Sequence, residues 1–306
     1  MHIAEQGEGL PVVLCHGFPE LWYSWRHQLP ALAAAGYYAI APDQRGYGRT
    51  DRPAAVGDYD MPHLTGDLLG LLDAIGEELA VVVGHDWGAL VAWELALRAP
   101  HRVSAVVGLS VAFTPRSPSP PTELMRAAAG DHFFYILYFQ EVGPADRELA
   151  EDPRRTIART LWSACGDAAN GSIRRLSRRG TRYLDILSDP PAELPPWLSA
   201  ADIERYASEF ARTGFTGALN WYRNIDRNWE ISEGLRGKHV TVPALFVAGE
   251  RDPVLRMVPP DAMDEWVSDL RGKILIPGAG HWIQQESPQE VNAALIRFLA
   301  TLPSSA

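Results

Sequence analysis

The chain has 306 residues, which is enough for one large domain with an insertion and a buried core. Hydrophobic residues make up 46% and charged residues 22%, which is typical of a folded globular protein and excludes a disordered chain. The formal net charge of −10 argues against nucleic acid as a partner, because a surface that binds phosphates needs a surplus of basic residues. A small neutral ligand fits this charge balance better.

The chain has two cysteines, Cys15 and Cys165, and the first ends an apolar run typical of a buried strand. Two such residues do not make a disulfide framework, so we expect a reducing compartment. The N-terminal stretch MHIAEQGEG lacks the basic and apolar regions of a signal peptide, and no run of about 18 apolar residues is long enough to span a bilayer. The sequence therefore predicts a cytoplasmic protein with no membrane partner.

Short apolar runs bounded by Gly, Pro and Asp alternate along the chain with longer patterns of helical spacing. This alternation is typical of a parallel sheet with helices on both faces, and so it predicts an α/β fold. Helices are expected at residues 64–75 and 89–99, and Pro100 ends the second. The predicted strands cover residues 11–15, 37–41, 79–83, 103–109, 244–248 and 273–276.

The alternation stops after Ser110 and resumes near Val240. The residues between them have helical patterns, a proline-rich stretch at 115–121 and many arginines, which predicts a helical lid inserted into the sheet domain. We therefore expect a core of residues 1–112 and 238–306 and a lid of residues 113–237. The arginines are interpreted as a solvated helical face rather than as an anion site. They include Arg154, Arg155, Arg174, Arg175, Arg178 and Arg179.

The pentapeptide GHDWG at residues 84–88 follows a predicted strand and precedes a predicted helix. Its two glycines allow the sharp turn of a nucleophile elbow, which projects the central side chain over the end of the sheet. That side chain is Asp86, which excludes a serine-type esterase. A carboxylate attacks saturated carbon and forms an alkyl-enzyme ester, so substrates should carry a leaving group on sp³ carbon, such as an epoxide oxygen or a halide.

Hydrolysis of such an ester needs a base and an acid that orients the base, and both follow predicted strands. Asp252 comes just after the strand at 244–248, and His281 comes just after the strand at 273–276. The chain order of nucleophile, acid and histidine is the order of this kind of elbow, and ligand sites in open α/β sheets lie at these strand ends. We expect His281 to be the general base and Asp252 to fix its tautomer. His85 is expected to be structural.

The predicted strand at 11–15 runs into His16, Gly17 and Phe18. A turn here can direct the backbone N–H of Phe18 at the site, and the N–H of Trp87 would be the second donor of an oxyanion hole. These donors would act when water attacks the ester carbonyl of Asp86. No metal or cofactor is expected, because the histidines lack the paired spacings of ligands and the chemistry needs only water.

Stretches spread over nearly the whole chain are similar to one known family. They are HGFPELWYSWR from His16, PDQRGYGRT from Pro42, GHDWG from Gly84, YILYFQEVG from Tyr135, GFTGALNWYRNIDRNW from Gly214 and GHWIQQESP from Gly280. These stretches resemble the α/β-hydrolase superfamily and, within it, the epoxide hydrolases, close to the C-terminal domain of the mammalian soluble enzymes. The resemblance gives Asp86, Asp252 and His281 the triad roles argued above.

The resemblance also implies a fold. The expected architecture is the α/β-hydrolase fold, a mostly parallel sheet flanked by helices with an inserted helical lid. The family usually has a full strand and a turn before the strand that here holds residues 2–5, so we expect the first edge strand to be missing. Loss of an edge strand would affect stability more than chemistry.

Two lid tyrosines of the family donate hydrogen bonds to the epoxide oxygen, and the resemblance places them at Tyr135 and Tyr222. Ring opening develops alkoxide charge, and a phenol with an ordinary pKa of about 10 can donate to it without being ionised at neutral pH. Tyr138, three residues further along a predicted helix, and Tyr23 are alternatives. Only the alignment ranks Tyr135 above Tyr138.

The pocket is expected to be apolar and to include Phe18, Pro19, Trp87, Ile136 and Trp282. The implied partners are a small apolar epoxide and water, with no nucleic acid and no membrane. The protein is expected to be a monomer or a homodimer.

The nearest alternative to an epoxide hydrolase is a haloalkane dehalogenase, which uses the same Asp nucleophile. Dehalogenases of this kind commonly have Asn, a halide-stabilising donor, where this chain has Phe18, and they do not need two lid tyrosines. A weaker alternative is a non-catalytic receptor that kept the fold and binds a ligand. Retention of both Asp86 and His281 argues against that alternative.

Overall fold

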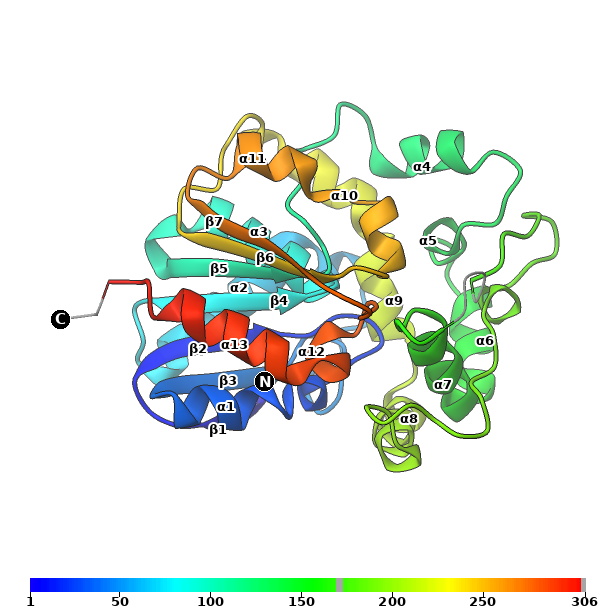
Figure 1. Cartoon of the computed structure of the whole chain (residues 1–306). Helices are drawn as coiled ribbons and strands as arrows, with labels where there is room; N and C mark the ends of the chain where they lie inside the picture. The colour runs from blue at the N-terminus through cyan, green and yellow to red at the C-terminus, as the bar shows by residue number, and fades with distance from the viewer. Residues whose placement is uncertain (169–172, 304–306) are drawn as a thin grey trace.

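The computed structural model describes residues 1–168 and 173–303, and within them it contains one seven-stranded sheet with the order β1-β3-β2-β4-β5-β6-β7. β1 pairs antiparallel with β3, and every other neighbouring pair is parallel. The predicted alternation of strands and helices is therefore confirmed (Figure 1). The strands are β1 His2–Gln6, β2 Leu10–Cys15, β3 Tyr37–Asp43, β4 Ala80–His85, β5 Val103–Leu109, β6 Ala244–Gly249 and β7 Leu270–Ile276.

Helices cover both faces of the sheet, and alternate side chains of each strand supply the two cores. Val12 and Leu14 face a cluster that includes α1 (Gln28–Ala34) and α13 (Pro288–Leu299). Val13 and Cys15 face the other cluster. That second cluster is formed with α2 (Met61–Ile75) and α3 (Trp87–Arg98). The remaining helices of the core are the short α11 (Met263–Trp266) and α12 (Ile283–Glu286).

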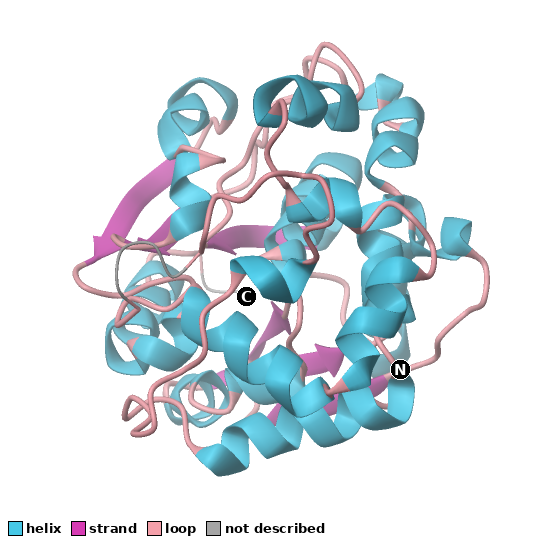
Figure 2. Ribbon diagram, turned by 90° about the vertical axis from the view of Figure 1, so that its right-hand side faces the viewer, coloured by secondary structure: helices cyan, strands magenta, loops and turns pink. Residues whose placement is uncertain are grey.

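Residues 110–243, between β5 and β6, are here called the insertion. It packs over one end of the sheet, where Figures 1 and 2 show its helices gathered beside the strands. Its buried side chains, such as Leu161 and Phe210, belong to the same cluster as α2 and α3. Residues 169–172 of the expected lid lie outside the described residues. The helices of the insertion are α4 Pro121–Ala129, α5 Tyr135–Tyr138, α6 Pro144–Glu151, α7 Pro153–Ser163, α8 Ala200–Thr213, α9 Thr216–Arg223 and α10 Ile225–Ile231.

Single turns of 3₁₀ helix make up much of the remaining connections. They are η1 Trp22–Trp25, η2 Val56–Tyr59, η3 Pro100–Arg102, η4 Tyr183–Ile186, η5 Glu233–Leu235, η6 Pro253–Arg256 and η7 Pro260–Ala262. In the described parts of the chain, none of the helices has both the length and the apolar character that crossing a membrane requires.

Element boundaries differ from the predicted ones for local reasons. β7 begins three residues before the predicted strand because it is the edge strand, whose side chains before Ile276 are all at least partly exposed and give a weak apolar run. α3 begins two residues early because Asp86 turns the chain directly from β4 into the helix. Within the described residues, β1 forms the other edge of the sheet and pairs only with β3.

The strand order places the carboxyl ends of β2 and β4 side by side, although β3 separates these strands in the sequence. The chain leaves β2 toward one side of the sheet and reaches β4 on the other, which opens a crevice above the point of reversal. Phe18, just after β2, and Asp86, just after β4, therefore meet in this crevice.

Gly108 of β5 provides a test of how closely α3 packs on the sheet. A Cβ atom at this position would overlap the ring of Trp93, whose Nε1 donates to the Val111 carbonyl at 3.0 Å. We expect Gly108→Ala to lower the free energy of unfolding by about 1–3 kcal/mol, since overpacking forces buried groups apart. Denaturant unfolding followed by circular dichroism measures this change.

Gly70 of α2 is the matched control, because it is exposed and a Cβ there meets nothing within 4 Å. Gly70→Ala should raise the free energy of unfolding by about 0.5–1 kcal/mol, as alanine favours the helix interior. Equal stability changes in the two variants would contradict the packing argument.

Candidate active site

The turn between β4 and α3 holds Asp86 in an uncommon backbone conformation, with φ 53° and ψ −119°. The glycines on either side allow this turn. A Cβ at Gly84 would overlap the backbone of Gly88, and a Cβ at Gly88 would overlap the carbonyl of Cys15 on β2. The predicted elbow is therefore present, and its strain is what directs the Asp86 side chain away from the sheet.

The two carboxylate oxygens of Asp86 have different partners. Oδ1 accepts a hydrogen bond from the N–H of Phe18 at 2.8 Å. Oδ2 lies 3.6 Å from Nε2 of His281, which is too long for a hydrogen bond. The N–H of Trp87 makes no hydrogen bond to this carboxylate among the described residues, although it begins α3 directly after Asp86. Oδ2 thus makes no hydrogen bond within the described residues and faces the ring of His281.

His281 joins the two carboxylates. Its Nδ1 lies 3.0 and 3.1 Å from the two oxygens of Asp252, and both side chains are buried. Burial by itself would lower the pKa of His281, but the charges of Asp252 and Asp86 raise this pKa well above its ordinary value. Burial would raise the pKa of Asp86, but His281 and the Phe18 N–H hold it below its ordinary value. The structure therefore pairs an imidazolium with an ionised Asp86.

His85 lies beneath His281 and is fully buried. Its Nε2 is 2.7 Å from the carbonyl oxygen of His281, and its Nδ1 is 2.7 Å from the carboxylate of Glu20. The two ring nitrogens of His85 therefore face a carboxylate on one side and a backbone carbonyl on the other. The hydroxyl of Ser110 donates to the same His281 carbonyl at 2.9 Å. His85 is therefore part of the support for the base.

Glu20 is the buried carboxylate that contacts the ring of His85. Its Oε1 accepts from the side-chain amides of Gln284 and Gln285, both at 2.9 Å, and its Oε2 accepts from the Gly17 N–H at 3.3 Å. Burial would raise the pKa of Glu20, but His85 lowers it below its ordinary value. Glu20 lies in the HGFPE stretch but belongs to no motif with a known chemical reason, so no pattern in the sequence predicts its role.

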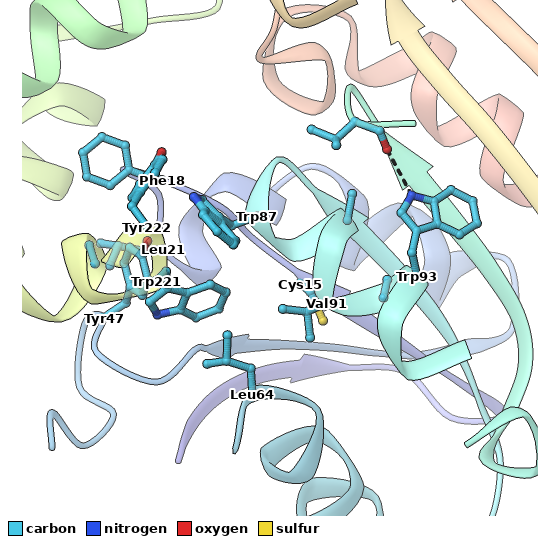
Figure 3. Packing of buried hydrophobic residues seen from close by; sticks show 14 of the residues in the cluster. Cys15, Phe18, Leu21, Tyr47, Leu64, Trp87, Val91, Trp93, Trp221 and Tyr222 are labelled. Atoms are coloured by element: carbon cyan, nitrogen blue, oxygen red, sulfur yellow. Dashed lines mark hydrogen bonds between the residues drawn. The ribbon is translucent and has the colours of Figure 1, made fainter. Parts of the chain in front are cut away.

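Tyr135 of α5 and Tyr222 of α9 both face the crevice. Their ring centroids are 6.1 Å apart, and Tyr222 also packs edge-on against Phe18 and Trp87, as Figure 3 shows. Neither hydroxyl has a hydrogen-bond partner among the described residues, and both line the same cavities as Asp86. Burial, aided by the charge of Asp86, raises the pKa of both phenols well above its ordinary value. Both are therefore neutral donors.

The two alternative tyrosines lie elsewhere. Tyr138 lines a separate surface cavity with Glu148 and Arg182. The hydroxyl of Tyr23 donates to Asp202 at 3.0 Å. Neither lines a cavity that contains Asp86.

Two cavities, of about 780 and 350 Å³, meet at Asp86, Tyr135 and Tyr222. Of the residues expected in the pocket, Trp87 and Ile136 line the larger cavity, Phe18 and Trp282 line the smaller, and Pro19 is buried but lines neither.

The walls of both cavities are mainly apolar, and Asp86 is the only acidic residue among the described residues that line them. Arg175 lines both cavities, Arg174 lines the smaller, and Arg256 lines both. The first two were interpreted from the sequence as solvated, and they are exposed, but the structure also places them at these cavity walls.

The chain is similar to known proteins over nearly its whole length. A model described as the alpha/beta hydrolase fold matches residues 11–288. The chain is 53% identical to Epoxide hydrolase A of Mycobacterium tuberculosis over 99% of this chain and 94% of that protein. It is 40% identical to Bifunctional epoxide hydrolase 2 of Mus musculus over 98% of this chain and 53% of that protein. The crystal structure of Epoxide Hydrolase A from Mycobacterium thermoresistibile matches with a TM-score of 0.95 and 54% identity, covering 99% and 95% of the two chains.

The sheet order, the elbow and the family match define an enzyme of the α/β-hydrolase class. Within that class, the identities of 53% and 54% over nearly whole chains show that this chain belongs to the epoxide hydrolase family.

The pKa of His281 tests the electrostatics of the site. Asp86→Asn removes one of the two charges that raise this pKa, so the midpoint of His281 should shift to lower pH. Titration of the ring resonances by NMR measures the shift. Asp261→Asn, which removes an exposed carboxylate, is the control and should leave the midpoint unchanged. An unchanged midpoint in Asp86→Asn would contradict the assigned charge pairing.

Proposed function

We propose that this protein opens epoxides to vicinal diols through a covalent ester on Asp86. The observation that carries the proposal is the meeting of the Asp86 carboxylate with two tyrosine hydroxyls in one cavity. Oδ2 of Asp86 is available for attack, and the hydroxyls of Tyr135 and Tyr222 have no hydrogen-bond partner among the described residues. A nucleophile and two neutral acids facing the same space suit an epoxide, because ring opening needs attack on a carbon and proton donation to the oxygen at the same time.

In the first half-reaction, Oδ2 of Asp86 bonds to an epoxide carbon and the bond from that carbon to oxygen breaks. The released oxygen takes a proton from Tyr135 or Tyr222, and the other phenol donates a hydrogen bond to it. Oδ1 stays on the Phe18 N–H and becomes the carbonyl oxygen of the ester. The low pKa of Asp86 keeps it ionised and able to attack.

In the second half-reaction, His281 takes a proton from water as the water attacks the ester carbonyl carbon. Negative charge develops on the oxygen held by the Phe18 N–H, and the free N–H of Trp87 at the start of α3 is the expected second donor. Collapse of this tetrahedral intermediate breaks the ester bond, releases the diol and regenerates the Asp86 carboxylate. After ring opening, the imidazolium of His281 passes its proton to the tyrosinate and becomes the neutral base. The proton that His281 then takes from water restores the imidazolium of the free enzyme, so the net reaction is the addition of one water to the epoxide.

Ester formation also prepares the base for its role. In the free enzyme the charge of Asp86 helps to raise the pKa of His281 and so favours the imidazolium. The ester is neutral, so this contribution disappears and the pKa of His281 falls. A neutral imidazole, which can accept a proton from water, is therefore favoured only after alkylation.

The apolar walls favour a small apolar epoxide as the substrate. We assign residues 113–237 as a lid that covers a core of residues 1–112 and 238–306. The lid supplies both tyrosines, and the core supplies the nucleophile, the base and the acid. Phe18, Trp87, Ile136 and Trp282 are the assigned contacts of the substrate.

Turnover of an epoxide tests the proposal against dehalogenation and against a receptor. Steady multiple turnover of styrene oxide to the diol is expected, with no halide released from a matched haloalkane. Asp86→Ala removes the nucleophile, so its diol formation should fall to the uncatalysed rate. Halide release, single turnover only, or near-normal activity of Asp86→Ala would each overturn the proposal.

The tyrosines are tested in a background that stops after the first half-reaction. His281→Gln lacks the base, so the alkyl-enzyme should accumulate and appear as a substrate-mass adduct by intact mass spectrometry. Adding Tyr135→Phe and Tyr222→Phe should slow adduct formation by about 10²-fold or more, the usual scale of general acid catalysis. Tyr138→Phe is the matched control and should leave the rate unchanged. An effect of Tyr138→Phe in place of the other two would reassign the acid.

A further inference from the structure

Three segments of the chain meet behind His281 at unusually short backbone distances. They are the end of α7 up to Gly166, the end of β6 at Gly249, and the loop from Gly278 to Trp282 that carries the base. A Cβ at Gly166 would lie 2.7 Å from the Gly280 nitrogen, and a Cβ at Gly249 would lie 2.6 Å from the Ala279 carbonyl carbon. Only glycines allow this approach, so the insertion contacts the backbone of the catalytic loop directly.

The carboxylate of Glu286 lies at this junction and holds both segments. Its Oε2 accepts hydrogen bonds from the N–H of Gly166, in the insertion, and from the N–H of Gly280, in the loop, both at 2.8 Å. Its Oε1 accepts from the N–H of Trp282 at 2.9 Å. One side chain therefore connects the insertion to the residues on both sides of His281.

The N–H of His281 itself donates to the carbonyl of Ala164, in the insertion, at 2.9 Å. The three successive N–H groups of the catalytic loop are thus bound by Glu286, by the insertion and by Glu286 again. The other contacts of His281 act on its ring, through Asp252, and on its carbonyl, through His85 and Ser110. The backbone N–H of His281 and those of its two neighbours are therefore held by the insertion and by Glu286.

We infer that Glu286 is a positioning residue that couples docking of the insertion to the placement of the His281 ring. The inference rests on the proposed role of His281 as the base of ester hydrolysis. A base displaced by about 1 Å can lose about a hundredfold in rate. Alkylation needs Asp86 and the tyrosines, so loosening this junction slows hydrolysis of the ester and leaves its formation nearly intact.

Glu286→Gln tests the inference. One carboxylate oxygen becomes an amide nitrogen, which cannot accept, so at least one of the three N–H groups loses its partner. We expect the rate constant for hydrolysis of the alkyl-enzyme to fall about tenfold or more, and that for alkylation to change by less than about twofold. Rapid quench of styrene oxide reactions, read by intact mass, measures both constants, and the adduct should accumulate.

Glu290→Gln is the matched control, because it removes the same charge from an exposed side chain four residues further on, and both constants should stay at their wild-type values. Equal slowing of the two half-reactions in Glu286→Gln, or slowing of neither, would overturn the inference. An absence of adduct even in His281→Gln would overturn the proposed mechanism instead, so the two failures are distinguishable.

Arg251→Gln gives a second measurement that does not depend on the folding of the Glu286 variant. Arg251 is exposed, and its guanidinium donates to the Gly166 carbonyl at 3.0 Å. Loss of this hydrogen bond should slow hydrolysis of the alkyl-enzyme by about threefold and leave alkylation unchanged, because it weakens the packing of Gly166 against the loop that carries His281. Should Glu286→Gln fail to fold, unchanged hydrolysis in Arg251→Gln overturns the inference.

Discussion

The negative charge of a carboxylate buried at the end of β4 must be balanced by hydrogen-bond donors and positive charge, and much of the site follows from that constraint. Asp86 receives one backbone N–H and the charge of His281. His281 in turn is held by Asp252, and its carbonyl is bound by His85, whose other ring nitrogen contacts the carboxylate of Glu20. Each buried imidazole thus has a carboxylate beside it: His281 has Asp86 and Asp252, and His85 has Glu20.

In the proposed mechanism, the pairing of Asp86 with His281 gives these two residues different roles at different stages. While Asp86 is ionised, its charge keeps His281 protonated, and the pair is stable but idle as a base. Converting Asp86 to an ester removes one of the anions beside His281. The same electrostatic coupling that stabilises the resting site therefore favours release of a proton from His281 when a base is needed.

The insertion contributes more than a cover over the crevice. Tyr135 and Tyr222 come from two of its helices. The Ala164 carbonyl accepts from the N–H of His281, and the Gly166 N–H donates to the carboxylate of Glu286. The proposed acids of the first half-reaction and part of the support for the proposed base of the second thus belong to one substructure. A shift of the whole insertion would move the tyrosines as well as this support, whereas loosening only the junction at Glu286 acts on His281.

Local sequence determined the fold class, the elbow and the order of Asp86, Asp252 and His281, because glycine spacing, apolar runs and strand ends act over a few residues. The choice of Tyr135 over Tyr138 rested on alignment alone, since residues three apart on a short helix can face the same way.

Only the tertiary structure decided which tyrosine reaches the crevice, that Pro19 misses the cavities, and that Glu20, His85 and Glu286 hold the base. These partners come from segments far apart in the chain, and nothing in local spacing encodes the distance between them.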